Sequence, residues 1–184
     1  MNTPFVPQEM FFTKGVGKHS HNLQSFESAL RGAGIAHFNL VRVSSIFPPG
    51  CKIISRQRGL AKLQAGQIVF CVMADVRTDE PNRLIGAGIG LAVPANKNDY
   101  GYLSEHHGFG LTQKRCSDLV EDMAASMLAT TRGADLDPDT AWDERQEIYR
   151  SKGLVVRTRA VVQTAEGDKN GKWTTAVAAA VFVS

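Results

Sequence analysis

Residues 39–50, with the sequence Asn-Leu-Val-Arg-Val-Ser-Ser-Ile-Phe-Pro-Pro-Gly, constrain the fold more than any other segment of the chain. The β-branched and aromatic side chains of residues 37–47 predict a strand. A proline has no N–H to give to a sheet, so the pair Pro48-Pro49 must end that strand. The adjacent Ser44 and Ser45 therefore lie at a strand end, between sheet pairing on one side and two rigid prolines on the other.

Two interpretations of this serine pair follow from the residues themselves. Side chains alternate along a strand, so an uninterrupted strand places Asn39 and Ser45 on the same face. A peptide bond at such a fixed junction can be held under strain, and the Ser45 hydroxyl is then placed to attack the carbonyl of Ser44. The ordinary interpretation is a simple strand end, because serine is common in turns. Composition and spacing leave both interpretations open.

The composition of the whole chain is that of an ordinary globular protein. With 184 residues, 43% of them hydrophobic and 21% charged, the sequence predicts a single domain over residues 1–184. A formal charge of +3 is too small and too dispersed to indicate a nucleic-acid partner. No apolar run approaches the roughly 18 residues that cross a bilayer, and residues 1–18 lack the layout of a signal peptide. We therefore expect a cytoplasmic protein with no membrane or nucleic-acid partner.

Hydrophobic periodicity predicts both helices and strands. Helices are expected at residues 22–33 and 112–131, and a short one at 142–149 within the polar stretch 135–152. Strands are expected at residues 37–47, 67–75, 84–93, 100–105, 154–164 and 173–183. The last two should form a hairpin, because an Asn-Gly pair lies between them. This order predicts an α+β fold in which mostly antiparallel sheets are sandwiched with helices.

Familiar cofactor motifs are incomplete in this chain. Residues 86–90 read Gly-Ala-Gly-Ile-Gly, but Leu91 stands where a dinucleotide loop needs its third glycine, and no helix follows. Glycines in a buried strand more often allow another element to pack closely. The histidines and cysteines also lack the spacing of a zinc site; they are His19, His21, His106, His107, Cys51, Cys71 and Cys116. We therefore expect neither a bound metal nor a bound nucleotide.

The segment at 39–49 is accompanied by further motifs at residues 11–17, 30–35, 86–90, 101–105, 131–133 and 173–182. Together they resemble the pyruvoyl-dependent arginine decarboxylase family. The string Asn-Leu-x-Arg-x-Ser-Ser-Ile-x-Pro-Pro is the specific part of this resemblance, whereas the glycine and alanine runs alone are weak. The resemblance covers almost the whole chain and implies the two-layer sandwich of that family, with helices outside.

The resemblance implies a proenzyme that cuts itself between Ser44 and Ser45. The products would be residues 1–44 and residues 45–184, and Ser45 would become the pyruvoyl cofactor at the start of the larger fragment. Asn39 matches a residue that the family associates with processing, and its amide could polarise the attacked carbonyl or hold an oxyanion. The ordinary role of such an asparagine is a hydrogen bond to backbone.

Two acidic residues match family positions that act on the substrate. Glu105 matches the catalytic glutamate, which donates a proton to the carbon that has lost CO₂. Its place after Tyr102 and Leu103 predicts partial burial, which favours the protonated form, and an exposed strand-end glutamate is the competing interpretation. Glu27 matches an acidic residue on the first helix that meets the substrate guanidinium, although a solvated helix face is its ordinary reading.

The resemblance therefore implies a lyase that converts L-arginine to agmatine and CO₂ and works as a trimer, or as a hexamer of paired trimers. Such a catalyst serves either polyamine biosynthesis or acid resistance. One alternative is a pyruvoyl decarboxylase for another amino acid, such as histidine or lysine. Another is a non-cleaving oligomeric binding protein of the same fold.

Overall fold

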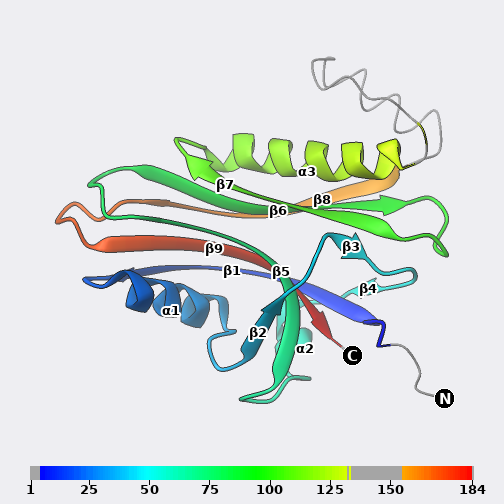
Figure 1. The fold of residues 1–184 in the computed structure, drawn as a ribbon, viewed down its shortest axis with the longest axis horizontal. Coiled ribbons are helices and arrows are strands. Elements are labelled where there is room, and N and C mark those ends of the chain that lie inside the picture. The colour runs from blue at the N-terminus through cyan, green and yellow to red at the C-terminus, as the bar shows by residue number, and fades with distance from the viewer. Residues whose placement is uncertain (1–4, 132, 134–154, 184) are drawn as a thin grey trace.

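A computed structural model describes residues 5–131, 133 and 155–183 of the chain (Figure 1). The helices are α1 (Asn22–Ala33), α2 (Arg56–Leu60) and α3 (Gln113–Thr130). The strands are β1 (Glu9–His19), β2 (Asn39–Arg42), β3 (Ile46–Phe47), β4 (Lys52–Ile53), β5 (Ile68–Thr78), β6 (Leu84–Pro94), β7 (Gly101–Phe109), β8 (Val155–Glu166) and β9 (Trp173–Val183). The short helix expected at 142–149 lies outside the described residues.

The strands form two sheets that pack face to face. Sheet A has the order β2-β5-β9-β1-β4, and sheet B has the order β3-β7-β6-β8. Most neighbours are antiparallel; the parallel pairs are β1 with β4 and β2 with β5. Helix α1 lies against the outer face of sheet A and α3 against the outer face of sheet B (Figure 1). This arrangement confirms the predicted α+β sandwich.

Apolar side chains fill the space between the sheets and beneath each helix. The inter-sheet core includes Met10, Val72, Ile89 and Leu103, all of which are almost fully buried. A second cluster lies between sheet A and α1 and is built from residues such as Phe11, Ala29, Ile35, Cys71 and Val177. Both sheets are therefore fixed against their neighbours by burial of apolar surface, the main favourable term in folding.

Both long helices were predicted correctly from their end signals. Helix α1 covers residues 22–33 and ends at Gly34, whose φ of 76° is the left-handed conformation that glycine adopts easily. Helix α3 begins after Thr112, whose hydroxyl accepts a hydrogen bond from the Arg115 N–H. The buried face of α3 includes Ala124, Ala125 and Ala129, whereas Leu119 is exposed.

The glycines of β6 explain this alanine-rich contact. A Cβ atom added at Gly90 would lie 2.0 Å from the carbonyl oxygen of Val120, and one at Gly88 would lie 2.9 Å from the Cys116 sulfur. Helix α3 therefore packs almost onto the backbone of sheet B, and small side chains suit such a close approach. The expectation that these glycines allow another element to pack closely is confirmed, because α3 packs against them.

The single strand predicted at 37–47 is wrong. The chain forms β2 in sheet A, leaves that sheet after Arg42, and enters sheet B as the two-residue strand β3. A bend at Ser45 interrupts the extended backbone, so the expected alternation of faces from Asn39 to Ser45 does not continue across it.

The hairpin predicted for the last two strands is also wrong. Strand β8 pairs with β6 in sheet B, whereas β9 pairs with β1 and β5 in sheet A. The turn at Asn170-Gly171 forms, with Gly171 at a φ of 74°, but it carries the chain from one sheet to the other. Sequence patterning did not predict β1. This long strand pairs with β9 over 11 residues, so β9 lies in sheet A and not beside β8.

Candidate active site

The segment Val43–Ser45 links an edge strand of sheet A to an edge strand of sheet B. Strand β2 lies at the edge of sheet A beside β5, and β3 lies at the edge of sheet B beside β7. In Figure 1 the chain rises from β2 to β3 across the open side of the sandwich. The Ser44–Ser45 peptide bond is therefore the point at which the chain passes between the sheets.

Three backbone hydrogen bonds hold this link. The Val43 N–H donates to the carbonyl of Cys71 in β5 over 3.0 Å, and the Leu103 N–H of β7 donates to the carbonyl of Ser45 over 2.7 Å. The Ile46 N–H donates to the carbonyl of Ser44 over 3.0 Å. A bond from residue i+2 to residue i defines a γ-turn, here centred on Ser45. Each side of the Ser44–Ser45 bond is thus anchored to a different sheet.

The link lies at the surface of the described chain. Ser44 is exposed and Ser45 is half-buried. Nearby apolar side chains are also unusually open, because Val41, Val43 and Ile46 are 40%, 37% and 41% exposed. Exposed apolar side chains gathered at one edge mark a surface that suits contact with another molecule.

Glu105 lies on β7, two residues beyond the backbone N–H that binds Ser45. Its predicted partial burial is wrong for this chain, because Glu105 is exposed. Strand β3 pairs with Gly101 and Tyr102 of β7 and is only two residues long. It therefore does not cover the edge of β7 at Glu105. The prediction treated the whole strand as covered.

The charges of Glu105 and Arg42 both act on the pKa of the Cys71 thiol in sheet A. Burial raises the pKa of the Cys71 thiol to about 11, while Arg42 acts to lower that pKa and Glu105 acts to raise it. Cys71 is the β5 partner of Arg42 and accepts the hydrogen bond from Val43. Glu105 therefore influences the pKa of Cys71, whose backbone carbonyl binds the Val43 N–H.

Asn39 is not brought to that link within one chain. Its side-chain amide donates to the carbonyl of Gly66 over 2.7 Å, at the opposite end of β2. Three strand steps separate Asn39 from Arg42, a distance of about 10 Å along the strand. In the described chain Asn39 fastens β2 to the turn before β5 and does not contact the carbonyl of Ser44.

Glu27 also lies away from the serine link. It is on α1, where its carboxylate accepts hydrogen bonds from Arg31 one turn later. The side chains are 47% and 73% exposed respectively, so this is a surface pair between neighbouring turns. A guanidinium already occupies the carboxylate that the sequence assigns to the substrate guanidinium.

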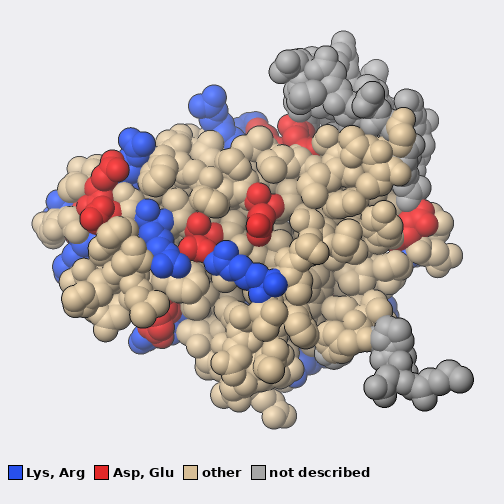
Figure 2. Space-filling view, in the orientation of Figure 1, with Lys and Arg blue, Asp and Glu red and all other residues tan. Residues whose placement is uncertain are grey.

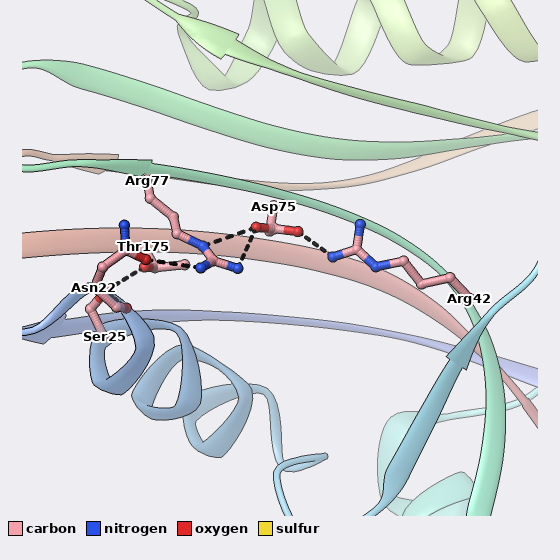
Figure 3. Close-up of polar contacts among 6 residues, drawn as sticks. All are labelled: Asn22, Ser25, Arg42, Asp75, Arg77 and Thr175. Atoms are coloured by element: carbon pink, nitrogen blue, oxygen red, sulfur yellow. Dashed lines mark hydrogen bonds and ion pairs between the residues drawn. The ribbon is translucent and has the colours of Figure 1, made fainter.

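Sequence reasoning missed a partly buried ionic group that includes Arg42, two residues before Ser44 (Figure 3). Asp75 of β5 accepts a hydrogen bond from Arg42 of β2 and another, over 3.2 Å, from Nε of Arg77. Arg77 also donates to the side-chain oxygen of Asn22 over 2.9 Å, at the start of α1. The Asp75 side chain is only 14% exposed. The alternation of residues along β5 was the available signal, since an acidic residue in an apolar strand implies a cationic partner.

This ionic group joins three elements. Ser25 of α1 shares a hydrogen bond of 2.7 Å with Thr175 of β9, and the Phe26 ring lies 4.2 Å from the guanidinium carbon of Arg77. Figure 3 shows Asn22, Ser25, Arg77 and Thr175 gathered where α1 meets sheet A. Through Arg42 the same group reaches β2, so it ties the start of the serine link to the body of the sheet.

A cavity of about 580 Å³ is lined in part by the loop that follows β3. Its lining includes Glu9, Pro48, Cys51, Arg58, Lys97 and Arg157, but neither serine of the link. Elsewhere the charges are mixed: on the face shown in Figure 2, basic and acidic side chains lie beside one another with neither sign dominant. A cationic ligand would therefore have to be held by individual carboxylates rather than by the overall charge.

Among the described residues, no three His, Cys, Asp or Glu side chains are grouped as a metal site would require. None of the described helices has the length and apolar character needed to cross a bilayer.

Comparison with known proteins identifies the family. The family profile of pyruvoyl-dependent arginine decarboxylases matches residues 9–184. The chain belongs to the pyruvoyl-dependent arginine decarboxylase family. Among its relatives, a probable pyruvoyl-dependent arginine decarboxylase of Chloroherpeton thalassium is 56% identical over 179 residues, covering 97% of this chain and 98% of the relative.

Two further relatives are also named as pyruvoyl-dependent arginine decarboxylases. Pyruvoyl-dependent arginine decarboxylase 2 of Methanosarcina mazei is 52% identical over 179 residues, which cover 97% of this chain and 98% of that protein. Pyruvoyl-dependent arginine decarboxylase of Methanococcoides burtonii is 52% identical over 178 residues, which cover 97% of this chain and 99% of that protein.

Pyruvoyl-dependent decarboxylases carry a covalently bound pyruvoyl group. The residues around position 45 fit a group made there. The Ser45 carbonyl is fixed by Leu103, its side chain is half-buried at an open edge, and Glu105 lies on the neighbouring strand. Arg42, Cys71 and Asp75 hold the preceding residues in place, so a group formed at residue 45 would have a rigid support.

Proposed function

We propose that this decarboxylase cuts itself between Ser44 and Ser45 and then converts L-arginine to agmatine and CO₂. The observation that carries the proposal is the γ-turn at Ser45, in which the upstream carbonyl is hydrogen-bonded and both flanking segments are anchored to different sheets. The family match over residues 9–184 and the printed names of the relatives support arginine as the substrate.

The cleavage uses only atoms of the serine pair and one water molecule. The Ser45 hydroxyl attacks the carbonyl carbon of Ser44, its proton passes to the departing amide nitrogen, and an ester replaces the peptide bond. Loss of a proton from the α-carbon of Ser45 then expels the Ser44 carboxylate. Water converts the remaining unsaturated amine to a ketone and releases ammonia. Residues 1–44 and residues 45–184 are the two products, and the second begins with the pyruvoyl group.

Once formed, the pyruvoyl group would accept the electron pair left on the substrate α-carbon when CO₂ departs. Glu105 is the residue that we assign to protonate the α-carbon of the product, because it stands on the strand that holds residue 45. Glu27 is assigned to bind the substrate guanidinium, which must displace Arg31 from its carboxylate. Asn39 is assigned to processing through its hold on β2.

We further propose that the enzyme is a trimer, or two trimers forming a hexamer, with Glu27 acting across a subunit contact. Apolar side chains exposed near the serine link support this; they are Val41, Val43 and Ile46. We place the enzyme in the cytoplasm, whose reducing conditions suit the free thiols of Cys51, Cys71 and Cys116. Light scattering before and after cleavage measures the assembly.

Intact-mass measurement of the purified chain tests the proposal directly. The wild-type chain should separate into residues 1–44 and 45–184 on incubation at neutral pH and should then release CO₂ from arginine in preference to histidine or lysine. Ser45→Ala should remain whole. Ser44→Ala is the matched control, because residue 44 contributes only its backbone carbonyl and should still be cut. A wild-type chain that stays whole, or a Ser45→Ala chain that splits at the same bond, would contradict the mechanism.

A further inference from the structure

The carbonyl oxygen of Ser44 has a backbone donor in the uncut chain. The Ile46 N–H lies 3.0 Å from this oxygen and closes the γ-turn around Ser45. Residue 45 is absent from the set of non-glycine residues with positive φ among the described residues, so this is the inverse γ-turn, the common and unstrained form. The donor is therefore in place without any distortion of the backbone.

Self-cleavage needs a donor at this atom. When the Ser45 hydroxyl adds to the carbonyl carbon, the double bond opens and negative charge collects on the Ser44 oxygen. A hydrogen-bond donor already aimed at that oxygen stabilises the charge as it develops and requires no reorganisation. The side chain of Asn39, the first candidate for this role, donates to Gly66 instead and lies several residues away along β2.

We propose that the backbone N–H of Ile46 is the oxyanion donor for the self-cleavage of this chain. The inference rests on the proposed function, and it assigns to the backbone a role that the sequence motif suggested for an asparagine side chain.

The sheets on either side keep this donor aimed. Leu103 fixes the carbonyl of Ser45, and that carbonyl belongs to the same peptide unit as the Ile46 N–H. The orientation of a planar peptide unit is set by its anchored oxygen, so the N–H on its opposite side points back toward Ser44. Strand β3 holds the following residues through pairing of Ile46 with Tyr102 and Phe47 with Gly101. Sheet B therefore sets the direction of the donor, and sheet A positions the acceptor.

Replacing one backbone N–H by oxygen tests the assignment. The α-hydroxy analogue of isoleucine, introduced at position 46 by stop-codon suppression in a cell-free system, removes the Ile46 N–H and keeps its side chain. The same analogue at position 54 is the matched control, because it removes the hydrogen bond of 2.9 Å from Ile54 to Met10, which lies outside the serine link. Intact mass distinguishes cleavage after Ser44 from simple hydrolysis of the new ester after Ser45.

We expect the ester at 46 to slow cleavage by about 100-fold or more, the usual loss when one oxyanion donor is removed. The ester at 54 should cleave at nearly the unmodified rate. Equal rates for the two esters would overturn the inference while leaving the proposed function intact. An unmodified chain that fails to cleave would overturn both.

A second measurement does not depend on whether the ester folds. In the uncut Ser45→Ala chain, hydrogen exchange followed by NMR should find the Ile46 amide protected, although its side chain is exposed. Exchange at the rate of an unstructured peptide would show that the hydrogen bond to Ser44 is absent and would overturn the assignment.

Discussion

The backbone N–H of Leu103 lies 2.7 Å from the carbonyl oxygen of Ser45, so residue 45 belongs to sheet B while its neighbour two residues earlier, Val43, is bonded to sheet A. A cut after Ser44 therefore leaves each new end attached to its own sheet. The smaller product keeps β1, which pairs with β9 along its whole length from Glu9 to His19. The two products are thus expected to stay together without a covalent link.

Glu105→Gln should separate cleavage from decarboxylation. The substitution removes the proposed proton donor but lies outside the serine pair, so cleavage should proceed at the wild-type rate. Decarboxylation should fall by about 100- to 10,000-fold, the usual contribution of a positioned general acid. Gel analysis of the products and release of CO₂ from labelled arginine measure the two steps. Full activity in the cleaved Glu105→Gln protein would remove Glu105 from the mechanism.

Glu27→Gln should weaken arginine binding more than it slows the reaction. Loss of a charged hydrogen-bond partner should raise KM by about 10- to 100-fold, with a smaller change in kcat. Arg31→Ala provides the opposite test, because it removes the side chain that occupies Glu27 and should lower KM. Steady-state kinetics on fully cleaved protein measure both. If both variants keep the wild-type KM, Glu27 does not meet the substrate.

Arg42→Ala should slow self-cleavage several-fold, because the four-residue strand β2 loses its ion pair with Asp75. Arg83→Ala serves as a control, since the long, exposed pair of Arg83 with Glu80 and its contact with the Phe109 ring both lie away from the link. The rate of appearance of the two fragments gives the comparison. Equal rates for the two variants would mean that β2 is held adequately by its backbone bonds to β5.

Gly90→Ala should destabilise the uncut Ser45→Ala chain by about 3 kcal/mol or more, because the added methyl would overlap the Val120 carbonyl of α3. Gly86→Ala is the matched control on the same strand. Its methyl would meet neighbours at an ordinary 3.5 Å, so the free energy of unfolding should change by less than about 1 kcal/mol. Urea unfolding measures both. Similar losses at the two positions would show that α3 does not approach Gly90 so closely.

Glu9 should contribute stability that is lost in acid. The hydrogen bond from Lys62, together with the charges of Lys62 and Arg58, lowers the pKa of Glu9 below its ordinary value of 4.5. A carboxyl group with a lowered pKa in the folded state stabilises the fold above its unfolded pKa, and this contribution disappears as the pH falls through the folded value. Glu9→Gln should therefore lower Tm at pH 7 and have no effect in strong acid.

The matched control for this pH dependence is Glu80→Gln, since the Glu80 side chain is 66% exposed and its pair with Arg83 is long. Thermal unfolding of the three proteins across the acid range measures the difference. A Glu9→Gln effect that is the same at pH 7 and at strongly acidic pH would show that the carboxylate charge is not its source.

Local signals predicted the parts of the fold that depend on neighbouring residues. The helices at 22–33 and 113–130 are set by apolar spacing and by their end residues, such as Gly34 and Thr112, and both were predicted. Sheet membership depends on partners far away in sequence. The split of 37–47 into β2 and β3, and the separation of β8 from β9, were therefore missed.

The same division applies to the candidate site. The family string assigned the cleavage to Ser44 and Ser45, because covalent chemistry depends on residue type, and this assignment stays a prediction. It did not predict the exposure of Glu105, which follows from the shortness of β3, nor the group around Asp75, which needs β2, β5 and α1 to be assembled. The Ile46 donor was also invisible, since a main-chain N–H leaves no mark on the sequence.

The γ-turn at Ser45 exists only when both sheets are complete, because each sheet supplies one of the anchors on either side of it. In an unfolded or half-assembled chain the Ser-Ser bond is an ordinary peptide bond with no directed donor and no fixed geometry. On the proposed mechanism, self-cleavage thus depends on the correct assembly of both sheets. A chain that misassembles either sheet would not form its cofactor, so only correctly folded molecules would become active.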